Sequence, residues 1–132
     1  DIASENDAEQ TMKYMVENHI PVEINLISNK RILNISGRKH PLNYYLSHGV
    51  PAVFSTDDEG VLRTDLTQQY VEAVLVHGLD YPTIKQINRN ALTYAFLPGK
   101  SIWQNAYKST PVAQCQDLNS KACYDFIKDN EK

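Results

Sequence analysis

The sequence has no apolar run that approaches the roughly 20 residues a membrane-spanning helix needs. It also has no excess of positive charge, because 13 lysines and arginines stand against 16 aspartates and glutamates, for a formal net charge of -3. That balance gives no support for nucleic-acid binding. Basic residues gather once, at Lys30, Arg31, Arg38 and Lys39. This cluster is typical of a solvated loop rather than of a phosphate site.

Short motifs of common hydrolases are missing as well. The histidines are His19, His40, His48 and His77. They show neither the HxH nor the HExxH spacing of zinc enzymes. No serine stands in a G-x-S-x-G context, so the sequence lacks the nucleophile elbow of α/β-hydrolases. We interpret His40 and His48, at the two ends of one expected helix, as capping or surface residues.

Cysteine is scarce, and Cys115 and Cys123 are the only 2 in the chain. Both lie in the polar C-terminal stretch, without a nearby histidine that would suggest a zinc site. They form either a local disulfide, which would favour an oxidising compartment, or two free surface thiols. The spacing leaves both alternatives open.

Hydrophobic periodicity predicts helices and strands in alternation across a chain whose length of 132 residues fits one globular unit. Expected helices cover residues 4–18, 41–48, 66–77, 81–97, 101–107 and 122–128, and expected strands cover residues 22–26 and 50–54. Residues 30–39 are expected to form a polar connection. Ser4 with Asp7 resembles a capping box for the first helix, and Thr64 or Asp65 is expected to cap the helix that follows.

The two expected strands are joined by a helix, which favours a parallel pair in an α/β fold. A pair of strands does not make a sheet that hides both faces. We therefore expect exposed apolar side chains at Val50, Ala52 and Phe54, and unpaired strand edges that another piece of the protein or a second copy would cover. The chain begins at Asp1 without a methionine, from which we expect a processed or excised piece of a larger α/β domain.

Polar side chains follow both expected strands. Ser28 and Asn29 come after the first strand. The second runs directly into Asp57 and Asp58. Adjacent carboxylates repel each other, so a site that keeps both ionised usually supplies a cation or a proton donor. Because the C-terminal ends of parallel strands carry the functional groups of α/β barrels, we predict that Asp57 binds a metal and that Asp58 binds a substrate.

A calcium-binding loop is a poor match to the acidic pair. An EF-hand would need Gly60 at its sixth position, which places Ser55 first and Leu66 last, where Asp and Glu are required. A plain strand-to-helix turn with a solvated acidic tip is the better alternative to a metal and substrate site.

Several segments together resemble the C-terminal part of the adenosine and AMP deaminase family, with the adenosine branch favoured. They are residues 21–29 (PVEINLISN), 40–41 (HP), 49–51 (GVP), 55–58 (STDD), 66–70 (LTQQY), 88–91 (NRNA) and 96–99 (FLPG). The resemblance covers roughly residues 4–103. It implies an eight-stranded (β/α) TIM barrel of the metal-dependent hydrolase type that binds one catalytic zinc and hydrolyses adenosine to inosine and ammonia.

By this resemblance, Asp57 is a zinc ligand and a catalytic residue that orients the attacking water, which zinc activates by lowering its pKa. Asp58 is the neighbour that hydrogen-bonds the purine ring near N7. Residues 1–104 then correspond to the C-terminal part of the barrel, with about its seventh and eighth strands, and residues 105–132 form a polar, partly helical extension.

The sequence also departs from the family pattern. The H-x-H zinc pair, the H-A-G-E segment with the proton-donating glutamate and the G-H-G histidine are absent, and Glu59 stands where many members have proline. We therefore expect that this chain alone neither holds zinc nor deaminates adenosine, and that the N-terminal part of the same enzyme completes it. AMP deaminase and a non-catalytic barrel-derived binding module remain as alternatives. The cysteine pair and the resemblance favour a periplasmic or secreted location over a cytoplasmic one.

Overall fold

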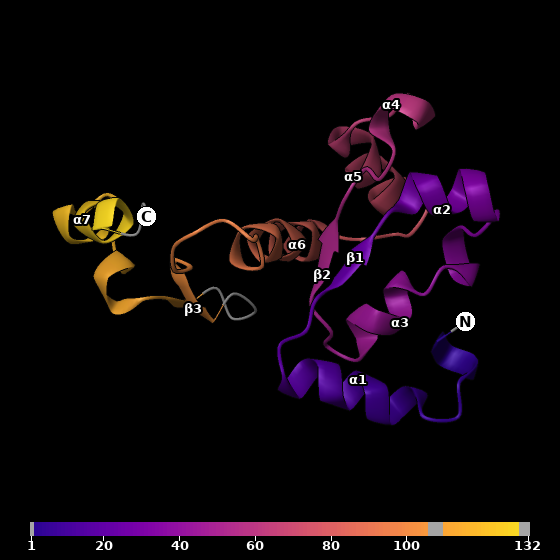
Figure 1. Cartoon of the computed structure of the whole chain (residues 1–132), viewed down its shortest axis with the longest axis horizontal. Coiled ribbons are helices and arrows are strands. Elements are labelled where there is room, and N and C mark those ends of the chain that lie inside the picture. The colour runs from indigo at the N-terminus through magenta and orange to yellow at the C-terminus, as the bar shows by residue number, and fades with distance from the viewer. Residues whose placement is uncertain (1, 106–109, 130–132) are drawn as a thin grey trace.

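A computed structural model describes residues 2–105 and 110–129 as an α/β arrangement with a C-terminal part that extends beyond it (Figure 1). The first part contains η1 (Ile2–Ser4), α1 (Ala8–Glu17), β1 (Val22–Ile24), α2 (Leu26–Leu33), η2 (Gly37–Lys39), α3 (Leu42–Ser47), β2 (Ala52–Phe54), α4 (Glu59–Leu62), α5 (Leu66–Leu75) and α6 (Tyr81–Thr93). The C-terminal part contains β3 (Trp103–Asn105), β4 (Thr110–Pro111), η3 (Ala113–Cys115) and α7 (Lys121–Asp129). Among the described residues, no helix has the length and apolar character needed to cross a bilayer.

Strands β1 and β2 pair in parallel, as the helical connection between them predicts. Val22 lies opposite Ala52, and Ile24 lies opposite Phe54. The ladder continues by one bond beyond the strands, since the Ser55 N–H donates to the Ile24 carbonyl over 3.1 Å. The strands are shorter than expected, and their C-terminal ends lie side by side.

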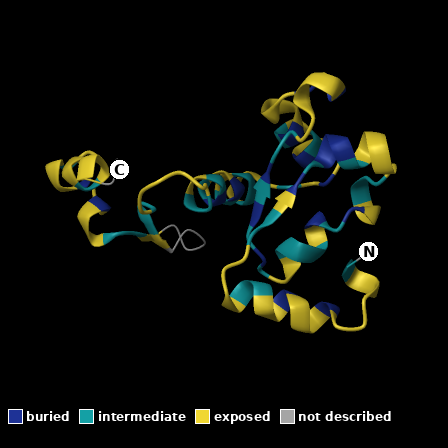
Figure 2. Cartoon of the chain, viewed as in Figure 1, coloured by how far each residue is buried: buried dark blue, intermediate teal, exposed yellow. Residues whose placement is uncertain are grey.

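The hydrophobic core lies on one face of this strand pair. Its buried members are Ile24, Leu26, Leu42, Ala52, Phe54, Ala73 and Ile87. They come from both strands and from helices α2, α3, α5 and α6, and Asn90 of α6 adds a buried hydrogen bond to the Ala52 carbonyl at 3.0 Å. The prediction that Val50, Ala52 and Phe54 would be exposed is wrong, because these helices cover them (Figure 2).

The opposite face of the strand pair lacks such a cover among the described residues. Successive side chains of a strand point to opposite faces, so Glu23 and Val53, which lie opposite each other, share this second face. Glu23 is exposed and Val53 is half-buried. The strand pair is therefore packed on one side only within the part of the chain that the structure describes.

Capping explains where two of the helices begin. The Asp65 carboxylate accepts a hydrogen bond from the Gln68 N–H at 2.8 Å, which confirms the expected cap of α5. Asp80 caps α6 in the same way through the Thr83 N–H, and these hydrogen bonds lower the pKa of its carboxyl group. The capping box at Ser4 is wrong: Ser4 ends the short 3-10 helix η1, and α1 begins only at Ala8.

The largest difference from the expected elements is helix α2, which occupies much of the stretch expected to be a strand end and a polar connection. Leu26, Ile27 and Ser28 are buried and give the helix an inner face, so its first turn replaces the end of the expected strand. The basic residues on this helix are engaged: Lys30 pairs with Glu72 at 2.8 Å, and Arg31 donates to the Leu62 carbonyl.

Two expectations near the C-terminal end of α6 also fail. This helix ends at Thr93, four residues before its expected end at residue 97, and Leu92 and Phe96 near this end are 72% and 107% exposed. Residues 103–105 form strand β3 instead of the helix expected over 101–107, and residues 106 and 107 lie outside the described residues.

The C-terminal part is held by a disulfide between Cys115 and Cys123. Both cysteines are fully buried, and the bond joins η3 to α7. Helix α7 (Lys121–Asp129) confirms the helix expected over residues 122–128. This short, polar segment has little apolar core, and the disulfide supplies part of the stabilisation that such a core would give.

Candidate functional site

Asp57 and Ser28 meet at the C-terminal end of the strand pair. The Ser28 hydroxyl donates a hydrogen bond of 2.6 Å to Asp57 Oδ2. A hydroxyl bonded to a carboxylate at this distance makes a strong, charge-assisted bond. Ser28 lies in the first turn of α2, and Asp57 lies just beyond β2, so the bond links the segments that follow the two strands.

The backbone around Asp57 also fixes its carboxylate. Asp57 has a φ of 56°, a left-handed conformation that aspartate tolerates better than most residues. Its N–H donates to Ser55 Oγ over 3.4 Å, and its carbonyl accepts from the Glu59 N–H over 2.9 Å. Within the described part of the chain, Oδ1 has no hydrogen-bond partner. One carboxylate oxygen is thus held by Ser28 while the other remains available on an exposed side chain.

Asp58 has a different environment from its neighbour. It stands before helix α4 as its N-cap residue, yet its side chain makes no capping hydrogen bond. Within the part of the chain that the structure describes, Asp58 is engaged through its backbone carbonyl, which accepts from the Leu62 N–H at 2.8 Å. The Asp58 side chain is exposed, so the two adjacent carboxylates differ: Ser28 holds Asp57, whereas Asp58 has no side-chain partner among the described residues.

Gln69 holds the first turn of α2, which carries Ser28, in place by a buried hydrogen bond. Sequence patterns alone assigned it no role. Its side chain is fully buried on α5, and its Oε1 accepts a hydrogen bond of 3.2 Å from the Ile27 N–H. This N–H belongs to the first turn of α2, where backbone donors lack partners within the helix. Gln69 therefore holds the turn that carries Ser28. The available signal is a polar residue on the same helical face as buried Ala73.

The place of Asn29 after the first strand suggested that it would lie beside Ser28 at Asp57. The structure places its side chain elsewhere. Its Oδ1 lies 2.9 Å from His40 Nε2 instead. His40 Nδ1 accepts a hydrogen bond of 3.1 Å from the Leu42 N–H at the start of α3, which places the ring proton on Nε2, from where it is donated to Asn29. His40 is 5% exposed, so it is a buried capping residue, whereas His48 lies on the surface.

A second histidine packs beside His40. The rings of His40 and His77 lie edge to face with centroids 5.3 Å apart. Burial, and secondarily the neighbouring His77, lower the pKa of His40 to about 4. Burial also lowers the pKa of His77, with Glu72 opposing and Lys30 reinforcing the shift. Both rings are therefore neutral at pH 7.

Metal-binding capacity is limited in this chain. In residues 2–105 and 110–129, no group of three or more His, Cys, Asp or Glu side chains is arranged to hold a metal ion. A catalytic zinc takes about three protein ligands. Asp57 Oδ1 has the chemistry of a single carboxylate ligand, which is fewer ligands than such a site takes.

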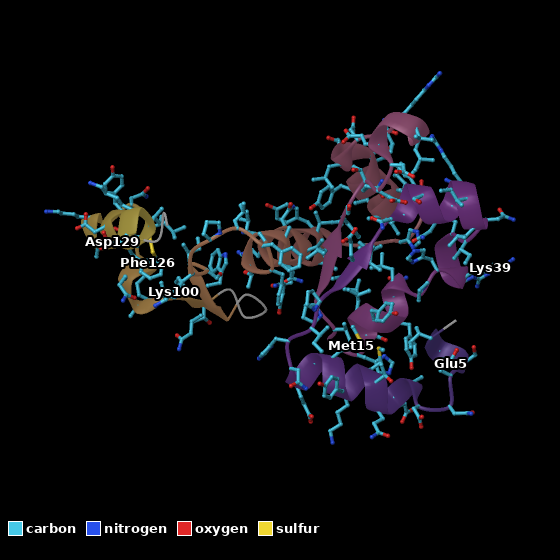
Figure 3. The ribbon with its side chains drawn as sticks, viewed as in Figure 1. Glu5, Met15, Lys39, Lys100, Phe126 and Asp129 are labelled. Atoms are coloured by element: carbon cyan, nitrogen blue, oxygen red, sulfur yellow. A yellow bond between two sulfur atoms is a disulfide. The ribbon has the colours of Figure 1, made fainter. Side chains whose placement is uncertain are left out.

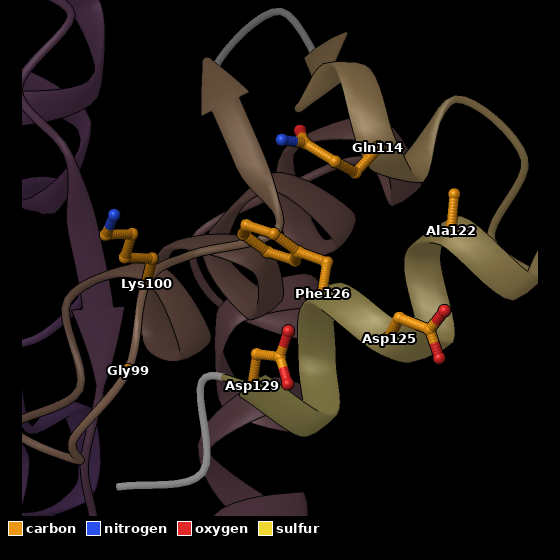
Figure 4. A pocket seen from close by; sticks show the side chains of 7 residues that line it. All are labelled: Gly99, Lys100, Gln114, Ala122, Asp125, Phe126 and Asp129. Carbon is orange, nitrogen blue, oxygen red and sulfur yellow. The ribbon is translucent and has the colours of Figure 1, made fainter.

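Neither of two cavities in the structure borders the acidic pair. One of about 740 Å³ lies in the C-terminal part, where Lys100, Phe126 and Asp129 face it (Figure 4). Another of about 350 Å³ lies near Pro51, at the opposite end of β2 from Asp57. Asp57 and Asp58 themselves are exposed.

Comparison with known proteins adds independent information. The family model described as "Adenosine deaminase" matches residues 2–104. The chain is 38% identical over 87 residues to the adenosine deaminase of Klebsiella pneumoniae (strain 342), a match that covers 65% of this chain and 26% of the relative. It is 36% identical over 87 residues to the adenosine deaminase of Escherichia coli (strain SE11), with the same coverage of 65% and 26%.

A relative named for a different activity matches at the same identity over a slightly shorter segment. The N6-methyl-AMP deaminase of Danio rerio is 38% identical over 81 residues, which cover 61% of this chain and 23% of the relative. The chain thus spans about a quarter of the length of the curated relatives it matches.

Proposed function

The chain belongs to the adenosine deaminase family, and we propose that the complete protein hydrolyses adenosine to inosine and ammonia at a zinc site. The observation that carries this proposal is the Ser28–Asp57 hydrogen bond at the C-terminal end of a parallel strand pair. That end is where parallel α/β barrels place their functional groups. The activities of the relatives supply the substrate class.

In this proposal, Asp57 is the residue of this chain that binds zinc. Zinc, when bound, makes water reactive at neutral pH. Asp57 Oδ1 is the available ligand oxygen, because Oδ2 already accepts from Ser28. The Ser28 hydroxyl fixes the direction of the carboxylate, a role that hydrogen-bonding partners of metal ligands commonly have. Asp57 also accepts a hydrogen bond from the attacking water and so orients it.

Asp58 binds the purine in this scheme. Its exposed carboxyl group is bound to no other described side chain. Because Asp58 directly follows Asp57, the proposed zinc ligand, its carboxyl group can reach a substrate that lies over Asp57. It hydrogen-bonds the purine ring near N7 and positions the carbon that bears the amino group. The Leu62 N–H holds the Asp58 backbone and limits how far this carboxyl group moves.

The remaining parts of the site come from polypeptide that this sequence does not include. The relatives are about four times as long as the matched segment, since that segment is 26% of the Klebsiella protein. We assign β1 and β2 to the seventh and eighth strands of a (β/α)8 barrel. The uncovered face with Glu23 and Val53 then points into the barrel, where the other strands enclose it.

A Ser28→Ala substitution in the complete protein is expected to weaken zinc binding by about 10- to 100-fold, the usual cost of losing a partner of a metal ligand. The Asp57 carboxylate would lose the 2.6 Å hydrogen bond that directs it. Competition with a chelator measures the zinc dissociation constant. Ser47→Ala is the matched control, because the Ser47 hydroxyl bonds only to near neighbours in the sequence, the Tyr44 carbonyl and His48 Nδ1. Unchanged zinc affinity in Ser28→Ala would show that this bond does not position a ligand.

An Asp58→Ala substitution is expected to keep zinc and to lower kcat/KM for adenosine by about 10- to 100-fold, because it removes the side-chain partner of the purine ring, and a polar group left without its partner costs about 1–3 kcal/mol. Zinc content and ammonia release are measured on the same preparation. Loss of zinc together with activity would move the metal-binding role to Asp58.

The same assay separates the candidate substrates. The zebrafish relative favours N6-methyl-AMP as a second candidate. Wild-type protein is therefore given adenosine, AMP and N6-methyl-AMP in parallel. Turnover of adenosine alone supports the proposed function. Turnover of a nucleotide alone overturns the assignment of substrate, and no turnover of any of them, with zinc bound, supports a non-catalytic module.

A further inference from the structure

Asn34, Ile35 and Ser36 form an Asn-x-Ser sequence in which x is not proline, and neither the deaminase site nor the core uses it. This is the acceptor sequence of N-linked glycosylation. We propose that Asn34 is an N-glycosylation site, which carries a glycan when the protein folds in the secretory pathway of a eukaryotic cell. This proposal is independent of the deaminase activity.

The position of Asn34 makes its side chain available. Asn34 ends helix α2 with φ 55° and ψ 35°, the left-handed conformation in which helices often end. The residue is exposed, and its backbone N–H is already satisfied by the Asn29 carbonyl. Its side-chain amide makes no hydrogen bond to any described residue. The amide nitrogen is thus neither buried nor held by the fold.

The Ser36 hydroxyl of the acceptor sequence also makes no hydrogen bond to a described residue, although Ser36 itself is half-buried. Ser36 has an extended backbone with φ -156° and ψ 164°, and its hydroxyl makes no capping bond to η2, which follows it. Its carbonyl accepts from the Lys39 N–H at 3.3 Å, which turns the chain after the acceptor sequence. Lys39 lies at the outer edge of the molecule (Figure 3). The asparagine that would carry the glycan is therefore exposed at the start of the connection between α2 and α3, as glycan attachment requires, and the half-buried Ser36 follows two residues later.

The attachment is a group transfer from a lipid-pyrophosphate oligosaccharide. Asn34 Nδ2 forms a bond to C1 of the first sugar while the bond from C1 to the pyrophosphate oxygen breaks. The lipid pyrophosphate leaves with that electron pair, and the amide nitrogen loses one proton to a base of the transferase.

The disulfide gives an independent argument for the compartment. Cys115 and Cys123 are the 2 cysteines of the sequence, and they pair with both residues fully buried. Disulfides form and persist in oxidising compartments, of which the endoplasmic reticulum lumen is one. That lumen is also where an exposed Asn-x-Ser sequence meets the transferase. The Cys115–Cys123 disulfide and the acceptor sequence are far apart in the chain, and both are consistent with folding in the endoplasmic reticulum lumen.

A glycan on Asn34 is compatible with the site at Asp57. Ser28 and Asn34 lie at opposite ends of α2, about 9 Å apart along its axis at 1.5 Å per residue. The residues just before Asn34, Ile32 and Leu33, are 60% and 58% exposed. A glycan at this end covers exposed apolar side chains while it leaves the Ser28 end of the helix open.

The test directs the complete protein into the endoplasmic reticulum of insect or mammalian cells with a leader peptide. Peptide N-glycosidase treatment is expected to lower its mass and to convert Asn34 to aspartate, as read by peptide mass spectrometry. Asn34→Gly removes the acceptor but suits the left-handed backbone, and Ser36→Ala removes the hydroxyl. Both variants are expected to migrate like the treated protein.

Ser36→Thr is the matched control, because it keeps the acceptor sequence and is expected to keep the glycan. Ser36→Ala provides the answer independently if Asn34→Gly fails to fold. Wild-type protein that enters the lumen, as shown by an intact Cys115–Cys123 disulfide, but carries unmodified Asn34 overturns the proposal. A mass shift that persists in both Asn34→Gly and Ser36→Ala overturns it as well, since the glycan would then lie elsewhere.

Discussion

Replacing Asp57 with asparagine in the complete protein is expected to lower kcat/KM for adenosine by more than about 100-fold, beyond the 10- to 100-fold effect of losing a ligand's hydrogen-bonding partner. The loss is expected to follow zinc content, because an amide is a much weaker zinc ligand than a carboxylate. Asparagine is the most informative replacement here. It tolerates the left-handed backbone at φ 56°, and its amide oxygen can still accept from Ser28.

Glu59→Gln is the matched control for this experiment. It removes the same charge two positions along the chain from an exposed side chain, while the Glu59 N–H still donates to the Asp57 carbonyl. It is expected to keep zinc and activity. Metal analysis and ammonia release are measured on both variants, with circular dichroism to verify folding. Full zinc occupancy and activity in Asp57→Asn would show that Asp57 is not a zinc ligand.

Acid is expected to destabilise the protein through His40. The pKa of this histidine falls from 6.5 in the unfolded chain to about 4 in the folded one. Between these values, the unfolded state binds more protons, so the free energy of unfolding decreases as the pH drops from 6.5 toward 4. The contribution of His40 to the free energy of unfolding is complete above pH 6.5 and amounts to at most about 3.4 kcal/mol, at 1.36 kcal/mol per pKa unit. The lowered pKa of His77 acts in the same direction.

Urea unfolding of the complete protein at a series of pH values between 7.5 and 4.5 measures this effect. His40→Asn removes the titrating ring but retains an oxygen that can cap α3 through the Leu42 N–H. It is expected to be less stable at pH 7.5 and to lose part of the pH dependence. His48→Asn, at an exposed position, is expected to behave like the wild type.

The comparison of His40→Asn with the wild type also separates histidine from carboxylate effects. Asp80 has a lowered pKa and loses its contribution to stability at lower pH, in the same way in both proteins. Lys30 and Glu72, which face His77, also remain unchanged in both. An identical slope between pH 6.5 and 4.5 in the two proteins would show that His40 is not the acid-sensitive group.

Local signals in the sequence predicted the features that depend on local chemistry. The Asp65 cap and the parallel strand pair follow from short-range patterns, and both are present. The placement of Ser28 and Asp57 after their strands was also sufficient to bring them together. Their roles toward zinc remain predictions that the proposed variants test.

Features that depend on packing between distant segments were not predictable in this way. Helix α2 begins at Leu26, where an alternating pattern favoured a strand, because burial of its first turn outweighs local preference. Gln69 was not identified as a buried anchor, since its partner is a backbone group 42 positions away. His40 was expected to be a capping or surface residue, and it does cap α3, but its burial was not expected. The pattern within the two strands also does not reveal which face of the strand pair is covered. That depends on the packing of helices α2, α3, α5 and α6.

The parallel register of β1 and β2 acts as a positional check on the chemistry. Ile24 and Phe54 lie opposite each other, and both face the core. A slip of one residue would turn an entire strand over, exposing its apolar side chains and moving Asp57 away from Ser28. A misaligned strand pair therefore loses the free energy of burying these apolar side chains, whether or not a ligand is bound. Substitutions at Ile24 or Phe54 are therefore expected to make the position of the Asp57 carboxylate less well defined, although neither side chain contacts it. Selection for activity then also acts on these two core residues.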